Sequence, residues 1–120
     1  WDWGIPTAQS TVEVATSTNN VEIISTGGIR SGIDAAKAIA LGADAAGIAY
    51  PLLEPAYGGD VGTVIKILEE YIRELRTTMF LTGAKNIEEL KKTSLLITGN
   101  LAERLQLRNI DSKKYVNRKC

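Results

Sequence analysis

The stretch that decides the fold is VEIISTGGIRSGIDAAKAIALGADAAGIAYP, residues 21–51. An apolar run ends in Gly27 and Gly28, and an alanine-rich segment with helical periodicity continues as far as Gly42. A second run of small apolar residues begins at Asp44. This order of strand, helix and strand with short connections is typical of a parallel βαβ unit, because parallel strands need a crossover between them.

The boundaries of this unit follow from local signals. We expect a short buried strand over residues 21–26 and an enclosed strand over residues 44–49. Ser31 and Asp34 have the spacing of a capping box, in which the hydroxyl accepts from the Asp34 amide and the carboxylate reaches back. Gly42 stands where a left-handed helix cap belongs. The apolar stripe expected on this helix is Ile33, Ala36, Ile39 and Ala40.

Further helices are predicted on both sides of this unit. Pro55 argues against a long continuation of the helix that follows the second strand. The next helix is the longest and runs to about Gly83, with apolar residues at spacings of three and four. Its stripe consists of Val64, Leu68, Tyr71, Ile72, Leu75 and Met79. The expected helix starts are Pro6, Tyr50, Asp60, Asn86 and Asn100.

Composition excludes several classes of function. The chain has 120 residues, with 14 basic and 14 acidic side chains, so its charge indicates neither nucleic-acid nor membrane-surface binding. It has no run of about 18 apolar residues that could span a bilayer. The single cysteine excludes an internal disulfide framework and fits a reducing compartment. Histidine is absent, which removes histidine acid–base chemistry and most zinc sites from this chain, and we expect no metal ligand in it.

The number of strands indicates an incomplete domain. Two parallel strands do not form an independent sheet, because a parallel sheet is covered on both faces and needs neighbouring strands. We therefore expect the chain to be the C-terminal part of a larger α/β domain. The order of elements fits strands 7 and 8, with their helices, of a (β/α)₈ barrel. Residues 84–120 would form a C-terminal helical extension.

The glycines after the first strand suggest an anion site. Gly27 and Gly28 allow a sharp turn that exposes backbone N–H groups, the next helix begins there, and Arg30 adds a positive charge. The second strand also runs into a short helix, at Ala49 and Tyr50. In (β/α)₈ barrels the loops after strands 7 and 8 form a recurrent phosphate site. The alternative interpretation is a tight turn with a solvated arginine.

The same residues resemble a known group of enzymes. TGGIRSGIDAAKAIALGADAAGIAYP is similar to the phosphate-binding end of FMN-dependent (β/α)₈ enzymes, which include several flavin oxidoreductases and inosine monophosphate dehydrogenase. The flanking segments WDWGIPTAQS and LRTTMFLTGAKNIEELKK resemble the type 2 isopentenyl-diphosphate isomerases more narrowly. The resemblance covers nearly the whole chain and weakens from about Asn100.

The resemblance implies a cytoplasmic isomerase that interconverts isopentenyl diphosphate and dimethylallyl diphosphate. It implies reduced FMN, NADPH as the reductant and Mg²⁺, with the Mg²⁺ and substrate ligands in preceding segments of the same barrel. We also expect a homo-oligomer. Catalytic residues are not identified in this chain. The residues that the resemblance assigns to the FMN phosphate are Gly27, beside the loop, then Gly28, Ile29 and Arg30 after strand 7, and Ala49 and Tyr50 after strand 8.

Two alternatives remain at this point. One is another FMN-dependent barrel, of the hydroxy-acid oxidase or nucleotide dehydrogenase type. The absence of histidine argues against the oxidases, although their catalytic histidine would precede the glycine loop. The other is a phosphate-binding module without chemistry. Trp1 and Trp3 could face the flavin or pack within their loop, and Cys120 is expected to be inert.

Overall fold

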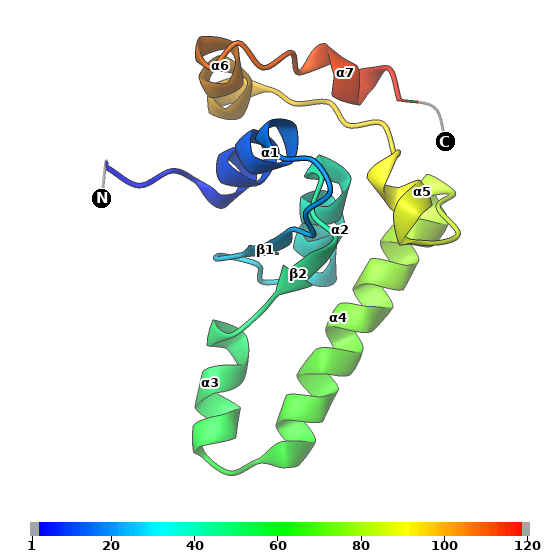
Figure 1. Ribbon diagram of the computed structural model, residues 1–120. Coiled ribbons are helices and arrows are strands. Elements are labelled where there is room, and N and C mark those ends of the chain that lie inside the picture. The colour runs from blue at the N-terminus through cyan, green and yellow to red at the C-terminus, as the bar shows by residue number, and fades with distance from the viewer. Residues whose placement is uncertain (1–2, 119–120) are drawn as a thin grey trace.

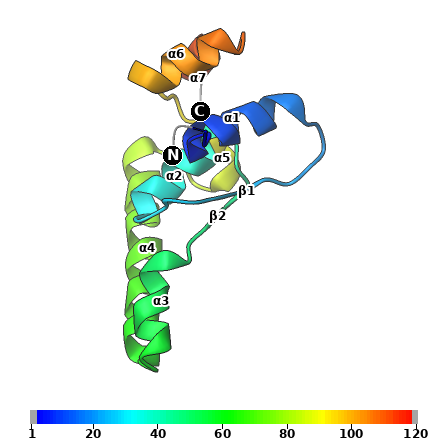
Figure 2. The same ribbon diagram turned by 90° about the vertical axis from the view of Figure 1, so that its left-hand side faces the viewer.

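The structure is a computed structural model that describes residues 3–118. In Figure 1 a pair of strands lies between helices, with the first two helices beside it and the next two extending away from it. Figure 2 shows the same arrangement from the side. The bounds are α1 (Thr7–Ser17), β1 (Ile24–Thr26), α2 (Gly32–Leu41), β2 (Ala45–Gly47), α3 (Tyr50–Tyr57), α4 (Val61–Thr82), α5 (Ile87–Lys91), α6 (Gly99–Leu107) and α7 (Lys113–Val116).

The predicted βαβ unit is present. Strands β1 and β2 pair in parallel, with Ile24 opposite Ala45 and Thr26 opposite Gly47, and α2 forms the crossover. The carboxyl ends of both strands therefore lie at the same edge of the sheet. The described part of the chain is an α/β structure.

Burial of the strands differs from the expectation. The first strand begins at Ile24 instead of residue 21, and the side chains of Val21 and Ile24 are 60% and 69% exposed. In the second strand Ala45 is also exposed. The prediction of buried strands is wrong for these residues, because the sheet has only two strands among residues 3–118 and the face that carries Ile24 is left uncovered.

The signals that begin and end α2 are largely confirmed. The Ser31 hydroxyl accepts from the Asp34 N–H at 3.0 Å, as predicted. The Asp34 carboxylate accepts from the Arg30 N–H at 3.2 Å, one residue before the amide expected for a capping box. Gly42 ends the helix with a φ of 127°, which is positive but lies outside the left-handed helical region. Ile33 is exposed, unlike the rest of the predicted stripe.

The long helix α4 also follows its sequence signals. Asp60 caps its start by accepting from the Thr63 N–H at 3.1 Å, and Gly83 ends it in the left-handed conformation with a φ of 76°. Of the predicted stripe, three side chains pack against the neighbourhood of α2, while two others remain exposed. The packed residues are Tyr71, Leu75 and Met79, and the exposed ones are Leu68 and Ile72.

The boundaries of three shorter helices can be compared with those predicted from the sequence. Helix α3 includes Pro55 and ends two residues later at Tyr57, so it is short, as expected. The start predicted at Asn100 is wrong, because α6 begins after Thr98, whose φ of −133° and ψ of 173° are the extended backbone of an N-cap. The Asn86 cap of α5 is confirmed, with its side chain accepting from the Glu89 N–H at 2.8 Å.

Helix α2 is the centre of the packing. Three groups of buried apolar residues surround it, and α2 contributes to each. These groups are Val12, Leu41, Leu105 and Tyr115; Ala36, Ile39, Ala84 and Leu90; and Ile29, Ala35 and Ala38. The helix after the glycine loop is therefore held from several directions.

The C-terminal residues cap the far end of α2. The Arg118 guanidinium donates to the Ala40 carbonyl at 2.6 Å and to the Lys91 carbonyl at 2.7 Å. It also lies over the Tyr115 ring, 4.1 Å from the ring centre, and the Tyr115 hydroxyl donates to the Leu41 carbonyl at 3.3 Å. A cation at a helix C-terminus is favourable, because the last carbonyls have no partner within the helix.

An ion pair joins α5 to the end of the sheet where both strands begin. Lys91 pairs with Asp44, whose carboxylate also accepts from the Ile23 N–H at 2.7 Å. The hydrogen bond from Lys91, followed by that from Ile23, lowers the pKa of Asp44. Residues 84–118 thus contact the βαβ unit at several points. Their assignment as a C-terminal extension stays a prediction.

Candidate anion-binding site

The loop after β1 adopts a backbone that favours glycine. Gly27 and Gly28 have φ values of 102° and 75°, a region that other residues rarely adopt. A β-carbon at Gly27 would lie 3.0 Å from the Thr7 hydroxyl oxygen of α1. A β-carbon at Gly28 would meet nothing within 4 Å. Gly27 therefore packs against α1, whereas Gly28 faces open space in which a ligand can lie.

The amides around this loop divide into two sets. The Arg30 N–H is taken by the Asp34 carboxylate, and the Gly32 N–H is taken by the Glu74 carboxylate of α4 at 2.6 Å. By contrast, the N–H groups of Gly28 and Ile29 have no hydrogen-bond partner among residues 3–118. These two amides are among the donors that the loop can offer to an anion.

The N-terminus of α2 differs from the role expected of it. The sequence suggested that the N-terminus of α2 would itself point at the anion. In the structure Glu74 and Asp34 already place carboxylates at that terminus, and the Ser31 hydroxyl caps a further amide. The helix terminus is therefore largely satisfied internally, and the loop amides are the more available donors.

The Ile29 side chain anchors the loop. It is buried and packs with Ala35 and Ala38 of α2, with Tyr71 of α4 and Ile48 alongside. Its backbone thus presents an unpaired amide while its side chain is fixed in the core. Such an arrangement gives the loop a defined shape before any ligand binds.

A hollow of about 230 Å³ adjoins the loop. Gly27, Gly28 and Ile29 line it together with residues of α1 and α2, including Thr7 and Lys37. Asp34 lines the same wall and pairs with Lys37 at 3.9 Å, so the two charges offset each other there. The volume is ample for a phosphate group, and binding of an anion there stays a prediction.

The other predicted site residues lie nearby but outside this hollow. Arg30 is exposed and does not line it. Ala49 is the residue before α3, and the side chain of Tyr50 is 78% exposed. Because β1 and β2 are parallel and paired, both loops leave the same edge of the sheet, where the Thr26 hydroxyl donates to the Gly47 carbonyl at 3.2 Å.

Sequence reasoning missed two residues of α4 beside this site. The sequence pattern does not single out Glu74, and it places Tyr71 only on the apolar stripe of the long helix. The Tyr71 hydroxyl is buried without a hydrogen-bond partner among residues 3–118. Burial, then the charges of Asp34 and Glu74, raise the pKa of this hydroxyl, while Arg30 opposes them. The available signal was a carboxylate three residues after Tyr71 on the face that packs against α2.

Replacing Tyr71 with phenylalanine is expected to stabilise the protein by about 1 kcal/mol, because a buried hydroxyl without a partner carries an uncompensated desolvation cost. Chemical denaturation of the full-length protein would measure this. Tyr57→Phe, at a side chain that is 94% exposed, is the matched control and should be neutral. A clear loss of stability in Tyr71→Phe would show that the hydroxyl has a partner in solution.

Neither a metal centre nor a membrane span is found in the described residues. Residues 3–118 contain no group of three or more histidine, cysteine or acidic side chains that could hold a metal ion. No helix within the same range has the length and apolar character needed to cross a membrane. Trp3 is exposed, and Trp1 and Cys120 lie outside the described residues.

Comparison with known proteins identifies the family. The sequence profile described as FMN-dependent dehydrogenase matches residues 1–97. The chain belongs to this FMN-dependent dehydrogenase family. The open space at Gly28 and the two unpaired loop amides fit the phosphate group of FMN.

Curated relatives of this family member carry a more specific name. The chain is 53% identical to isopentenyl-diphosphate delta-isomerase of Methanothermobacter thermautotrophicus, over 98% of the chain and 33% of the relative. It is 57% identical to the protein of that name from Thermococcus onnurineus, over 97% and 30%. The identity is 50% to that of Pyrococcus furiosus, over 100% and 30%. The chain thus spans about a third of the length of these relatives.

Proposed function

We propose that this chain supplies the FMN phosphate-binding loops of an isopentenyl-diphosphate delta-isomerase. The observation that carries the proposal is the glycine loop after β1, which leaves two amides unpaired beside an open space. The names of the relatives support the choice of reaction, which is the conversion of isopentenyl diphosphate to dimethylallyl diphosphate. When bound, reduced FMN would supply the means to move protons at the allylic carbon.

The residues of the chain would act by binding and orienting the cofactor. The N–H groups of Gly28 and Ile29 would donate to the phosphate, and the turn at Gly27 allows them to face it. Arg30 would neutralise part of the phosphate charge from the solvent side. Ala49 and Tyr50, at the end of the adjacent strand, would complete the second side of the cradle.

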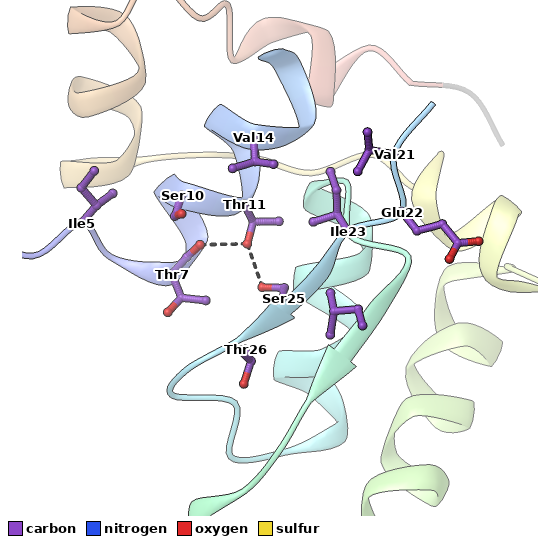
Figure 3. Close-up of a pocket in the computed structure, with 11 residues that line it drawn as sticks. Ile5, Thr7, Ser10, Thr11, Val14, Val21, Glu22, Ile23, Ser25 and Thr26 are labelled. Atoms are coloured by element: carbon purple, nitrogen blue, oxygen red, sulfur yellow. Dashed lines mark hydrogen bonds between the residues drawn. The ribbon is translucent and has the colours of Figure 1, made fainter. Parts of the chain in front are cut away.

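We further propose that β1 and β2 are strands 7 and 8 of a (β/α)₈ barrel. A groove of about 500 Å³ runs between α1 and β1, as Figure 3 shows, and the apolar side chains of Ile5, Val14 and Val21 lie along it. The Thr11 hydroxyl shares a hydrogen bond of 2.7 Å with the Ser25 hydroxyl on its inner wall. An exposed apolar strand edge needs a covering neighbour. The preceding part of the same barrel would be that neighbour.

The remaining components would lie beyond this segment. Residues 3–118 have no group of three or more acidic, histidine or cysteine side chains that could hold Mg²⁺, so the ion and the substrate diphosphate would be held by preceding segments. NADPH as the reductant, a homo-oligomeric state and a cytoplasmic location are part of the same proposal. Residues 84–120 would be the C-terminal helical extension of the barrel domain.

The decisive experiment follows both the product and the flavin. Full-length protein with FMN, a reductant and Mg²⁺ should convert isopentenyl diphosphate while the reduced flavin is not consumed. Removing FMN should abolish the conversion. Oxidation of flavin or nicotinamide in proportion to turnover would instead support another FMN-dependent oxidoreductase, which the name of the family favours as the second candidate. Phosphate binding without flavin would point to a non-catalytic module.

A further inference from the structure

A carboxylate of the long helix holds the start of α2. Glu74 accepts from the Gly32 N–H at 2.6 Å, across a separation of 42 residues in sequence. The two helices touch closely at this point, because a β-carbon on Gly32 would lie 2.2 Å from the Tyr71 carbonyl oxygen and 2.5 Å from the Leu75 nitrogen. The first residue of α2 is therefore fixed against the backbone of α4.

This contact lies next to the anion-binding loop. Gly32 comes four residues after Gly28 in the sequence, and the buried side chain of Ile29 fixes the segment between them. The Asp34 carboxylate ties the Arg30 N–H to the same helix. Because the Ile29 side chain and the Gly32 backbone are both fixed in place, the unpaired N–H groups of Gly28 and Ile29 have defined directions.

We propose that Glu74 is a positioning residue for the phosphate loop. This inference rests on the proposed function, because it assumes that the loop binds the FMN phosphate. Glu74 acts through Gly32, and its negative charge would itself oppose a phosphate at this end of the sheet. Its contribution is therefore geometric, and a neutral acceptor of the same length should replace it.

The test compares FMN with riboflavin, which lacks the phosphate. Both affinities are measured by flavin fluorescence on the full-length apoprotein. Glu74→Ala should weaken FMN binding about tenfold, the size of one hydrogen bond to a charged group, and leave riboflavin binding unchanged. Glu74→Gln should retain most of the FMN affinity. Glu70→Ala, which removes the exposed pair with Arg73 at 2.9 Å on the same helix, is the matched control and should change neither affinity.

The outcomes separate this inference from the proposed function. If the wild-type protein binds riboflavin as tightly as FMN, the phosphate site itself is refuted. If the wild type prefers FMN and Glu74→Ala keeps that preference, or loses affinity equally for both flavins, only the positioning role is overturned. Should Glu74→Ala not fold, Glu74→Asp is used instead, because its shorter side chain cannot reach Gly32, and the same loss of FMN preference is expected.

Discussion

Replacing Gly32 with alanine is expected to destabilise the protein by at least about 3 kcal/mol, or to prevent folding. The added β-carbon would lie 2.2 Å from the Tyr71 carbonyl oxygen and 2.5 Å from the Leu75 nitrogen. Both are backbone atoms within a regular helix, so neither can move aside as a flexible side chain would. Relief would require α2 and α4 to separate, which would open the packing between them.

Gly62→Ala is the matched control for this prediction. Gly62 also lies in the first turn of a helix, but its β-carbon would approach only the Asp60 carboxylate oxygen, at 3.4 Å. Alanine is favoured over glycine in helices by up to about 1 kcal/mol, so this variant should be neutral or more stable. Denaturation by urea of both full-length variants is the measurement. An unchanged midpoint for Gly32→Ala would contradict the close contact between the helices.

Replacing Gly28 with valine is expected to weaken FMN binding by at least about 100-fold. The β-carbon meets no protein atom within 4 Å, so the substitution fills the space assigned to the phosphate. The φ of 75° also disfavours a β-branched residue, and a shifted backbone would misdirect the Gly28 and Ile29 amides. Loss of one or two hydrogen bonds to a charged group accounts for an effect of this size.

Gly59 provides a control with the same backbone strain. Its φ is 74°, and a β-carbon there would also meet nothing within 4 Å. Gly59→Val and Gly28→Val should therefore lower the free energy of unfolding by similar amounts, while only Gly28→Val loses FMN. Titration of each full-length apoprotein with FMN would show the difference. Equal FMN affinities in the two variants would refute the assignment of the loop.

Helix ends were predictable because their causes are local. Ser31, Asp60 and Asn86 each accept from an amide three residues later, and Gly83 adopts the left-handed conformation that favours glycine. Each signal lies within a few residues of its effect. Burial was not predictable in the same way. The apolar character of Val21 shows that it needs cover, but not which segment provides it.

In the candidate site, too, the local features were predictable and those that depend on distant residues were not. Paired glycines after a strand predicted the positive φ values at Gly27 and Gly28, because few other residues adopt them. The sequence did not show which amides of the loop remain unpaired. That depends on how far the side chains of Asp34 and Glu74 reach, and Glu74 comes from a helix 42 residues away in sequence.

The Arg118 cap has a consequence for the order of events during synthesis. Arg118 is 78 residues later in the chain than Ala40, whose carbonyl it binds. At about 5–20 residues per second, the ribosome adds this residue roughly 4–16 s after Ala40. Until then the Ala40 and Leu41 carbonyls lack the partners that Arg118 and Tyr115 provide, whereas the Ala38 and Ile39 carbonyls are already bonded by the N–H groups of Ala43 and Gly42. The C-terminal end of the helix that follows the glycine loop therefore completes its contacts late, after α7 has been made.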